Sequence, residues 1–355
     1  MTAIIKSVGN FCNLRCVYCF YSHLDQASFQ KMEHGLLKKL IKDMGEVGIA
    51  KVTAIWHGGE PLLAGLDFYK LAIAEQKLYP DVQFENRLQT NATFLDERWV
   101  SFFKDNNFGI GVSLDGTKRI QDLQRPDRQG HSTFDKVVKN LELMQKLGLK
   151  FGLIQTITSK GLGFIRESQE FFYHTLGLRS WKINFVDESS CLINVVDDPT
   201  ITISENNLLQ AYDELIDFWM STNDPSLEIE EIDQFVAAFL GRRPSSCNFS
   251  GSCGNYFCVD YNGLVYPCDR ICFDDQHLLG DLREKSLLEI MTGDKAEKFR
   301  LKVRNVHPDC ISCKWRPFCN NGCTAMHNKT GKYRHCEVRK KVFERICSMT
   351  ASSQK

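Results

Sequence analysis

The first 190 residues alternate short runs of β-branched and aromatic residues with longer segments in which apolar residues recur every three or four positions. The short runs are typical of strands and the longer segments of amphipathic helices. Predicted strands cover residues 3–8, 52–56, 84–89, 110–114, 151–157 and 181–186, and predicted helices cover 36–47, 68–78, 96–104, 134–147 and 164–176. This alternation predicts βαβ units and a parallel sheet. Six repeats are too few for an eight-fold barrel. We therefore expect an α/β fold with a partial (β/α)6 TIM-like barrel, and a doubly wound sheet is the alternative.

The pattern changes after residue 186. Residues 187–203 have the composition of a long loop, and residues 204–220 and 231–240 have helical periodicity. The chain then becomes rich in cysteine, with short β-rich segments at 256–261 and 264–266 and a last helix predicted at 338–346. We therefore divide the chain into a barrel at 1–190, a helical linking region at 191–245, a cysteine-rich domain at 246–347 and a tail at 348–355.

Charge and hydropathy exclude several classes of protein. Lys and Arg together number 44, as do Asp and Glu, so the formal net charge is +0 and gives no electrostatic basis for binding nucleic acid. No apolar stretch reaches the roughly 18 residues that span a bilayer, and the N-terminus lacks the plan of a signal peptide. We expect a cytoplasmic protein that binds neither nucleic acid nor membrane.

The cysteines are unevenly placed. Of 15 in the chain, four lie in residues 1–246 and eleven in residues 247–355. Because a reducing cytosol disfavours disulfides, clustered cysteines in a cytoplasmic protein indicate metal binding or redox work.

Cys12, Cys16 and Cys19 follow the first predicted strand with the spacing C-x3-C-x2-C. Three thiolates leave one iron of a 4Fe–4S cluster without a protein ligand, and that iron is an open coordination site. A zinc site completed by His23 is the alternative. Loops at the carboxyl ends of barrel strands carry catalytic residues, which favours the cluster.

The segment Cys12-Asn-Leu-Arg-Cys16-Val-Tyr-Cys19 resembles the signature of the radical S-adenosylmethionine (SAM) enzymes. The resemblance implies that the three cysteines hold a 4Fe–4S cluster whose open iron chelates SAM. One electron from the cluster would then release a deoxyadenosyl radical. By the same resemblance, Tyr18 packs near the adenine.

Further motifs follow in the order that this family shows. Gly58-Gly59-Glu60-Pro61 resembles its GGEP element, in which glycine lets the backbone approach a ligand and Glu60 accepts from the SAM ammonium. The third and fourth predicted strands end near Thr90 and Ser113. The resemblance implies SAM-binding roles for His57, Gly58, Gly59, Glu60, Thr90, Asn91, Ser113, Asp115 and Arg125.

Two of these roles have alternatives. Arg125 suits the SAM carboxylate because a guanidinium forms paired hydrogen bonds with a carboxylate, but it is otherwise an ordinary solvated charge in a loop. His57 either forms a hydrogen bond with the same carboxylate or fills space.

The C-terminal cysteines resemble the SPASM extension that one branch of the radical SAM enzymes carries. The resemblance implies two auxiliary 4Fe–4S clusters, and thus three in all. The first would be bound by Cys247, Cys253, Cys268 and Cys323, and the second by Cys310, Cys313, Cys319 and Cys336. A pair of zinc-ribbon sites is the alternative, because C-x2-C spacing suits zinc equally well. Cys191, Cys258, Cys272 and Cys347 are left over; we expect Cys258 and Cys347 to be buried, whereas Cys191 and Cys272 are candidates for reactive thiols.

Two groups of peptide-modifying enzymes resemble this chain. Anaerobic sulfatase-maturating enzymes, which make formylglycine from Cys or Ser, share Cys19-Phe-Tyr21 and Tyr266-Pro-Cys-Asp269. They typically carry Gln where this chain has His57, and the stretch Trp-His-Gly-Gly-Glu-Pro-Leu-Leu resembles maturases of ribosomal peptides, including cyclophane-forming ones. We therefore expect a maturase that cross-links or otherwise oxidises a precursor peptide, with formylglycine formation as the alternative. An iron–sulfur electron carrier or a zinc-binding module is the non-enzymatic alternative.

Asp269 and Tyr21 are the candidate catalytic residues. We expect Asp269 to accept the substrate proton while an auxiliary cluster takes the electron, with its pKa raised by the cluster charge and by partial desolvation. Otherwise Asp269 caps a turn. Tyr21 either positions the substrate or packs at the barrel mouth.

The expected partners are a precursor peptide or protein substrate and an electron donor such as flavodoxin or ferredoxin. The chain begins only a few residues before its first predicted strand, which leaves no room for an N-terminal peptide-recognition domain. We therefore expect the substrate to bind at the barrel mouth and the 187–203 loop, or through a separate recognition protein.

Overall fold

The computed structural model describes residues 1–19, 21, 29–187, 200–272 and 274–352, and its contacts divide the chain into two units. Unit 1 comprises residues 1–113, 125–152 and 254–302, and unit 2 comprises residues 114–124, 153–253 and 303–355. No helix in these described ranges is both long enough and apolar enough to cross a membrane.

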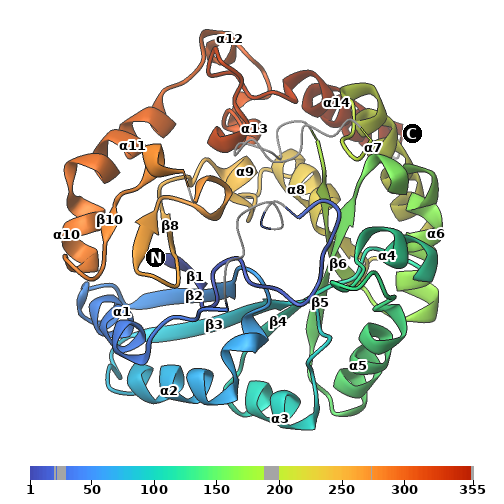
Figure 1. Ribbon diagram of the computed structural model, residues 1–355. Coiled ribbons are helices and arrows are strands. Elements are labelled where there is room, and N and C mark those ends of the chain that lie inside the picture. The colour runs from blue at the N-terminus through green and yellow to red at the C-terminus, as the bar shows by residue number, and fades with distance from the viewer. Residues whose placement is uncertain (20, 22–28, 188–199, 273, 353–355) are drawn as a thin grey trace. The chain divides into compact units, whose positions relative to one another are not determined.

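Unit 1 contains a parallel sheet whose strands are connected by helices. β1 (Thr2–Lys6), β2 (Lys51–His57), β3 (Gln83–Thr90) and β4 (Gly109–Ser113) pair in sequence order. The intervening helices α1 (His34–Glu46), α2 (Leu66–Gln76) and α3 (Glu97–Asp105) lie on the same side of these strands (Figure 1). η2 (Pro61–Ala64) precedes α2, and α5 (Phe134–Lys146) also belongs to this unit. The α/β fold with a parallel sheet is confirmed.

The two faces of β2 have different partners. Trp56 is fully buried and packs edge-on against Phe68 and Tyr69 of α2, with ring centroids 5.9 and 5.3 Å away. Successive side chains of a strand point to opposite faces of the sheet. His57 therefore points away from α2, and its register partner on β1 is Lys6. This second face carries the polar residues of the candidate site.

Part of the cysteine-rich segment extends the same sheet. β8 (Tyr256–Val259) pairs parallel with β1, β9 (Leu264–Tyr266) pairs antiparallel with β8, and β10 (Gly280–Asp281) pairs antiparallel with β9. The strand order within unit 1 is thus β10-β9-β8-β1-β2-β3-β4. The remaining elements are η5 (Asp269–Ile271), η6 (Asp275–His277), α10 (Leu287–Thr292) and most of α11 (Asp294–Arg304). This pairing brings the end of β9 to the first strand of the chain.

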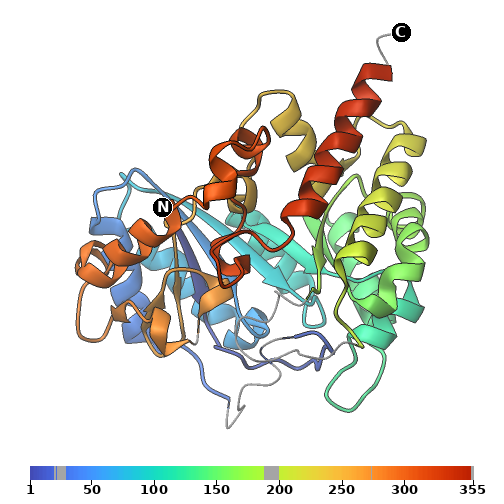
Figure 2. The same ribbon diagram turned by 90° about the horizontal axis from the view of Figure 1, so that it is seen from above.

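Unit 2 contains a second set of parallel strands. Most of β5 (Phe151–Ile157) belongs to it, and β6 (Ser180–Phe185) pairs with both β5 and β7 (Glu228–Ile229). The longest helices are α7 (Glu205–Thr222) and α14 (Cys336–Ser352), which run side by side in Figure 2. Arg345 of α14 joins them by ion pairs with Asp213 and Asp217 of α7. The shorter elements are α4 (Lys118–Gln124), η3 (Ser159–Phe164), α6 (Ile165–Glu170), η4 (Phe171–Thr175), α8 (Glu230–Phe239), α9 (Cys247–Ser250), α12 (Pro308–Ile311), α13 (Arg316–Cys319) and η7 (Thr324–Met326).

Two predicted helices differ markedly from the observed ones, and the observed helices α4, α10 and α11 were not predicted. The helix predicted at 164–176 is α-helical only as α6, because 3-10 turns precede it and η4 is a π-helical turn. The last helix begins at Cys336 and extends to Ser352, well beyond the predicted 338–346. Of the loop predicted at 187–203, residues 188–199 lie outside the described residues.

Candidate active site

The loop after β1 carries the first three cysteines and is held by two neighbouring segments of unit 1. The Arg15 amide donates to the carbonyl of Pro126 at 2.9 Å, and Arg128 Nε donates to the carbonyl of Cys12 at 2.7 Å. On the other side, Asn13 Nδ2 donates to Thr93 Oγ1 at 2.9 Å. The loop is therefore fixed independently of any metal.

The donor set of this loop fits an iron–sulfur cluster. Cys12 Sγ accepts hydrogen bonds from the Leu14 amide at 3.4 Å and from Asn91 Nδ2 at 3.7 Å. Burial raises the pKa of Cys12 to about 12, and the nearby charges of Glu60 and Cys19 contribute to the rise. A thiol of this kind ionises readily only when a metal replaces its proton. Cys16 is also buried, and Cys19 is partly exposed. His23, the fourth ligand of the zinc alternative, lies outside the described residues.

The glycines of the Gly-Gly-Glu-Pro element allow two backbones to meet. Gly59 N–H donates to the Gly9 carbonyl at 2.8 Å, and Glu60 N–H donates to the Phe11 carbonyl at 2.9 Å. A Cβ on Gly59 would lie 1.9 Å from the Phe11 oxygen, and Gly58 adopts a φ of +115°. These glycines thus allow the backbone after β2 to approach the segment that leads into the cysteine loop.

Glu60 joins the carboxyl ends of β2 and β3. Its Oε1 accepts from the Leu62 amide at 3.0 Å and from Thr90 Oγ1 at 2.8 Å, and its Oε2 accepts from the Asn91 amide at 2.8 Å. Burial raises the pKa of Glu60 to about 7, although these hydrogen bonds and Arg125 favour the ionised form. The structure therefore brings Thr90 and Asn91, at the end of β3, to Glu60.

Arg125 lies at the same end of the sheet and is only 7% exposed, so it is not a solvated loop charge. Its Nη1 donates to the hydroxyl of Tyr18, and its guanidinium lies 5.9 Å from the centre of the Tyr18 ring. Ser113 Oγ, at the end of β4, accepts from Gln89 Nε2 at 2.9 Å.

Asp115 belongs to unit 2 and is fully buried there. Its Oδ1 accepts from the Thr156 amide at 3.0 Å, and its Oδ2 accepts from Gln124 Nε2 at 3.0 Å. Both carboxylate oxygens thus fasten α4 to β5, which is a role within the scaffold.

The half-buried Asp269 forms a cluster with the buried side chains of Tyr21 and of Lys6, which no sequence motif indicated. Asp269 Oδ1 lies 2.5 Å from Lys6 Nζ and accepts from the Tyr21 hydroxyl at 2.9 Å. Lys6 is 0% exposed, donates to the Tyr21 hydroxyl and lies 4.1 Å from the centre of that ring. The sequence did contain a signal for this contact, because Lys6 ends an otherwise apolar strand and a buried ammonium requires a negative partner.

The predicted rise in the pKa of Asp269 is wrong. Burial is the largest single effect and raises the pKa, but the positive charges of Lys6 and His57 and the hydrogen bonds from Lys6 and Tyr21 together outweigh it. The net pKa therefore lies well below the ordinary value, and Asp269 is ionised at neutral pH.

His57 lies beside this cluster as the register partner of Lys6. Its Nδ1 is buried and has no hydrogen-bond partner within the described part of the chain. Burial lowers the pKa of His57, and Lys6 lowers it further against the opposing effect of Asp269. A neutral imidazole with a free ring nitrogen is therefore available to a ligand.

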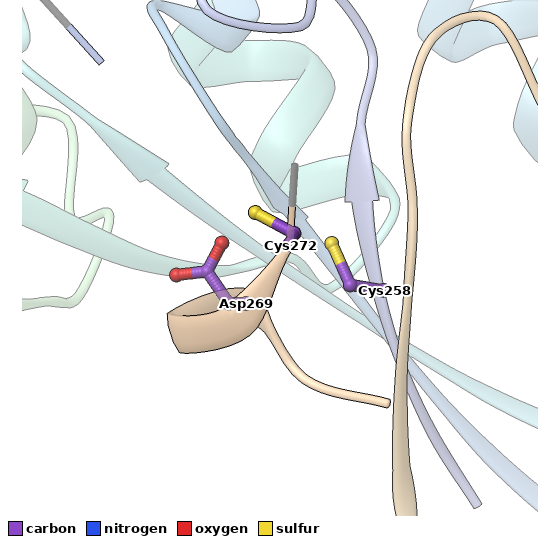
Figure 3. A group of neighbouring side chains, drawn as sticks. All are labelled: Cys258, Asp269 and Cys272. Atoms are coloured by element: carbon purple, nitrogen blue, oxygen red, sulfur yellow. The ribbon is translucent and has the colours of Figure 1, made fainter. Parts of the chain in front are cut away.

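Two of the leftover cysteines lie next to Asp269. Cys258 on β8 and Cys272 after η5 are both 0% exposed, and their sulfurs and an Asp269 oxygen lie within 4.8 Å of one another (Figure 3). These are donors that a metal ion could use. However, Lys6 already supplies the positive charge that faces the Asp269 carboxylate, so we interpret the two thiols as part of the core. The expected burial of Cys258 is confirmed, Cys347 is half-buried, and Cys191 lies outside the described residues.

The cysteines predicted to bind the second auxiliary cluster gather in unit 2. Burial raises the pKa of Cys310, and the thiolates of Cys319 and Cys313 raise it further. Burial also raises the pKa of Cys336, with a contribution from Cys319. Charges on these thiols therefore influence one another, but no three of the four lie within the 4.8 Å of one another that a single metal ion such as zinc would need, so their grouping around a cluster stays a prediction.

The cysteines of the first predicted auxiliary site are divided between the units. Cys247, Cys253 and Cys323 belong to unit 2, where Asn320 Nδ2 donates to the Phe249 carbonyl at 2.6 Å and joins α13 to α9. Cys268 belongs to unit 1, so its grouping with the other three stays a prediction.

Comparisons with known proteins agree with this arrangement. The radical SAM superfamily model matches residues 6–170, and the iron–sulfur cluster-binding SPASM model matches residues 247–314. A cysteine-type anaerobic sulfatase-maturating enzyme of Clostridium novyi (strain NT) is 29% identical, over 98% of this chain and 96% of that protein. A serine-type enzyme of Klebsiella pneumoniae is 28% identical, over 94% of this chain and 84% of that protein.

A solved structure described as native anSMEcpe with bound AdoMet and Cp18Cys peptide has the same fold, with a TM-score of 0.85 and 28% identity. The match covers 97% of this chain and 96% of that one. The chain is therefore an enzyme with a radical SAM domain over residues 6–170 and an iron–sulfur cluster-binding SPASM domain over residues 247–314.

Proposed function

We propose that this enzyme oxidises a cysteine or serine side chain of a protein substrate to formylglycine. The observation that carries the proposal is the similarity of nearly the whole chain to anaerobic sulfatase-maturating enzymes of both the cysteine and the serine type. The half-buried Asp269 in Tyr266-Pro-Cys-Asp269, beside Tyr21, supports it. This reaction is better supported than the peptide cross-linking that His57 suggested.

The cofactors have candidate ligands in the chain. Cys12, Cys16 and Cys19 would hold the cluster that binds SAM, with Glu60 and Arg125 nearby, and the eight SPASM cysteines would hold two auxiliary clusters. When bound, these groups supply hydrogen-atom abstraction and one-electron transfer. An electron donor of the flavodoxin or ferredoxin class and a peptide segment of the substrate protein complete the set of partners that we propose.

The residues of unit 1 provide the proton chemistry. Removal of a hydrogen atom from the substrate Cβ leaves a radical that must lose one electron, to an auxiliary cluster, and the proton of its thiol or hydroxyl to form a carbon–heteroatom double bond. With serine the product is the aldehyde; with cysteine it is a thioaldehyde, which water hydrolyses to the aldehyde with release of hydrogen sulfide. In this proposal Asp269 accepts that proton, and the supporting observation is that Lys6 keeps its carboxylate ionised while Tyr21 donates a hydrogen bond to it. The free ring nitrogen of His57 orients the substrate heteroatom.

The test uses the reconstituted enzyme with SAM, dithionite and two synthetic sulfatase-derived peptides that differ only in carrying Cys or Ser at the target position. We expect an aldehyde that a hydrazide reagent captures in at least one of the two peptides. A modified peptide that has lost hydrogen yet resists the hydrazide would instead indicate a cross-link, and the proposal would be replaced by the precursor-peptide alternative. A separate recognition protein is needed only if both peptides remain unmodified while a whole sulfatase is converted.

A further inference from the structure

Arg339 on α14 is a buried cation that points at a cysteine. It is 5% exposed, and its Nη1 donates to Cys319 Sγ at 3.4 Å and to the Asn248 carbonyl at 3.0 Å. Its Nη2 donates to Asn248 Oδ1 at 3.0 Å and to the Tyr333 hydroxyl at 3.1 Å. The guanidinium also lies over the rings of Phe249 and Tyr333, 4.1 and 4.2 Å from their centres.

The partners of Arg339 do not balance its charge. Among residues 1–19, 21, 29–187, 200–272 and 274–352, no carboxylate lies within ion-pair distance of this guanidinium. A buried charge is costly unless an opposite charge accompanies it. Burial raises the pKa of the Tyr333 hydroxyl and keeps it neutral, which leaves Cys319 as the partner that can carry negative charge. The charge of Cys319 also influences Cys310 and Cys336, which are predicted to bind the same auxiliary cluster. A set of cluster-bound thiolates would supply the missing negative charge.

We propose that Arg339 is a positioning residue that donates a charge-assisted hydrogen bond to the Cys319 thiolate of the second auxiliary cluster and thereby makes that cluster easier to reduce. Reduction adds negative charge, and a fixed cation with an N–H donor at a ligand sulfur stabilises the reduced form more than the oxidised form. An electron acceptor for substrate oxidation needs this property. The proposal rests on the ligand role of Cys319 and does not depend on which side chain the enzyme oxidises.

Asn248 gives Arg339 a second effect. It follows Cys247, a predicted ligand of the first auxiliary cluster, and both its carbonyl and its side chain accept from Arg339. Arg339 therefore connects one predicted ligand segment from each auxiliary site, and its planar fork of donors suits four acceptor atoms at once. Lysine carries the same charge but cannot make this set of contacts.

The test is a redox titration followed by electron paramagnetic resonance. The full chain carries Cys12→Ala, Cys16→Ala and Cys19→Ala, so that every cluster signal comes from the SPASM cysteines. Into this background we introduce Arg339→Gln, Arg339→Lys and, as a control, Arg345→Gln. Arg345 lies on the same helix, but its charge is already paired with Asp213 and Asp217.

For Arg339→Gln we expect the reduction equilibrium constant of one auxiliary signal to fall about tenfold, which for a one-electron couple is a shift of about 59 mV to more negative potential. Arg339→Lys should shift the same signal by less, and Arg345→Gln should leave it unchanged. An unchanged potential in Arg339→Gln at full iron content overturns the proposal, as does an equal shift in Arg345→Gln. Loss of iron from both Arg339 variants also overturns it, because Arg339 would then be purely structural. If the parent protein gives no auxiliary signal after reconstitution, the ligand role of Cys319 fails instead.

Discussion

Replacing Lys6 by Met should expose how strongly the buried pair with Asp269 is coupled. Two unit charges 2.5 Å apart attract by about 7 kcal/mol at an effective dielectric constant of about 20. Desolvation offsets much of this attraction, so removing one partner of such a buried pair costs about 3–5 kcal/mol. Lys70→Met is the matched control, because the pair of Lys70 with Asp67 is exposed and contributes less than about 1 kcal/mol.

The assay is anaerobic urea unfolding of four proteins: the parent, Lys6→Met, Asp269→Asn and the double variant. We expect the double variant to be less destabilised than the sum of the single variants by about 2–3 kcal/mol, because the second change removes the orphaned charge. A coupling energy below about 0.5 kcal/mol would refute the stabilising ion pair between Lys6 and Asp269.

The pH dependence gives an independent check of the same pair. In the parent, the pKa of Asp269 is lowered, so its contribution to stability is present above the unfolded-state pKa and is lost only as the pH falls through the folded-state value. In Lys6→Met, burial dominates and the folded-state pKa rises above the unfolded-state value. The destabilisation of this variant should therefore shrink as the pH falls from about 8 to about 5. A penalty that grows over this range would contradict the assignment.

Three further predictions concern the cysteine loop and the proton acceptor. Replacing Cys12, Cys16 and Cys19 together by Ala should abolish deoxyadenosine formation, measured by chromatography. Iron analysis should show the loss of about four irons, because the auxiliary clusters remain. A normal yield of deoxyadenosine would refute the assignment of these cysteines as ligands of the SAM-binding cluster. Gly59→Ala should lower both the melting temperature and the iron content, because the added Cβ would meet the Phe11 oxygen. The control is Gly35→Ala, whose Cβ has open space and should stabilise α1 by about 0.5–1 kcal/mol. Equal melting temperatures of the two variants would argue against the clash. Asp269→Asn should still cleave SAM but make no aldehyde in a hydrazide assay, and full product would show that the proton goes elsewhere.

The sequence predicted the helices and strands of the barrel region well because the apolar periodicity of each segment is a local property. The ends of β2, β3 and β4 and the motifs that follow them were located on this basis. The spacing of Cys12, Cys16 and Cys19 also predicts a cluster site, because cluster ligands within one loop are close in sequence as well as in space.

The contacts of Asp269 could not be predicted in the same way. Lys6 meets Asp269 because β8 pairs with β1 and places the end of β9 beside the first strand, and no local pattern encodes that pairing. Because the contact with Lys6 was unknown from the sequence, burial and cluster charge alone gave the wrong direction for the pKa of Asp269. The role of Arg339 was hidden for a similar reason, because its partners Asn248 and Tyr333 lie on separate segments.

The central claim is that the enzyme removes a hydrogen atom from the Cβ of a cysteine or serine and delivers the product as an aldehyde. The most direct measurement uses a target peptide that is deuterated only at that Cβ, with mass spectrometry of deoxyadenosine and hydrazide labelling of the peptide in the same reaction. We predict deuterium in deoxyadenosine together with a labelled aldehyde. Unlabelled deoxyadenosine, formed while the peptide is nevertheless oxidised, would contradict the claim, because the hydrogen would then have come from another position.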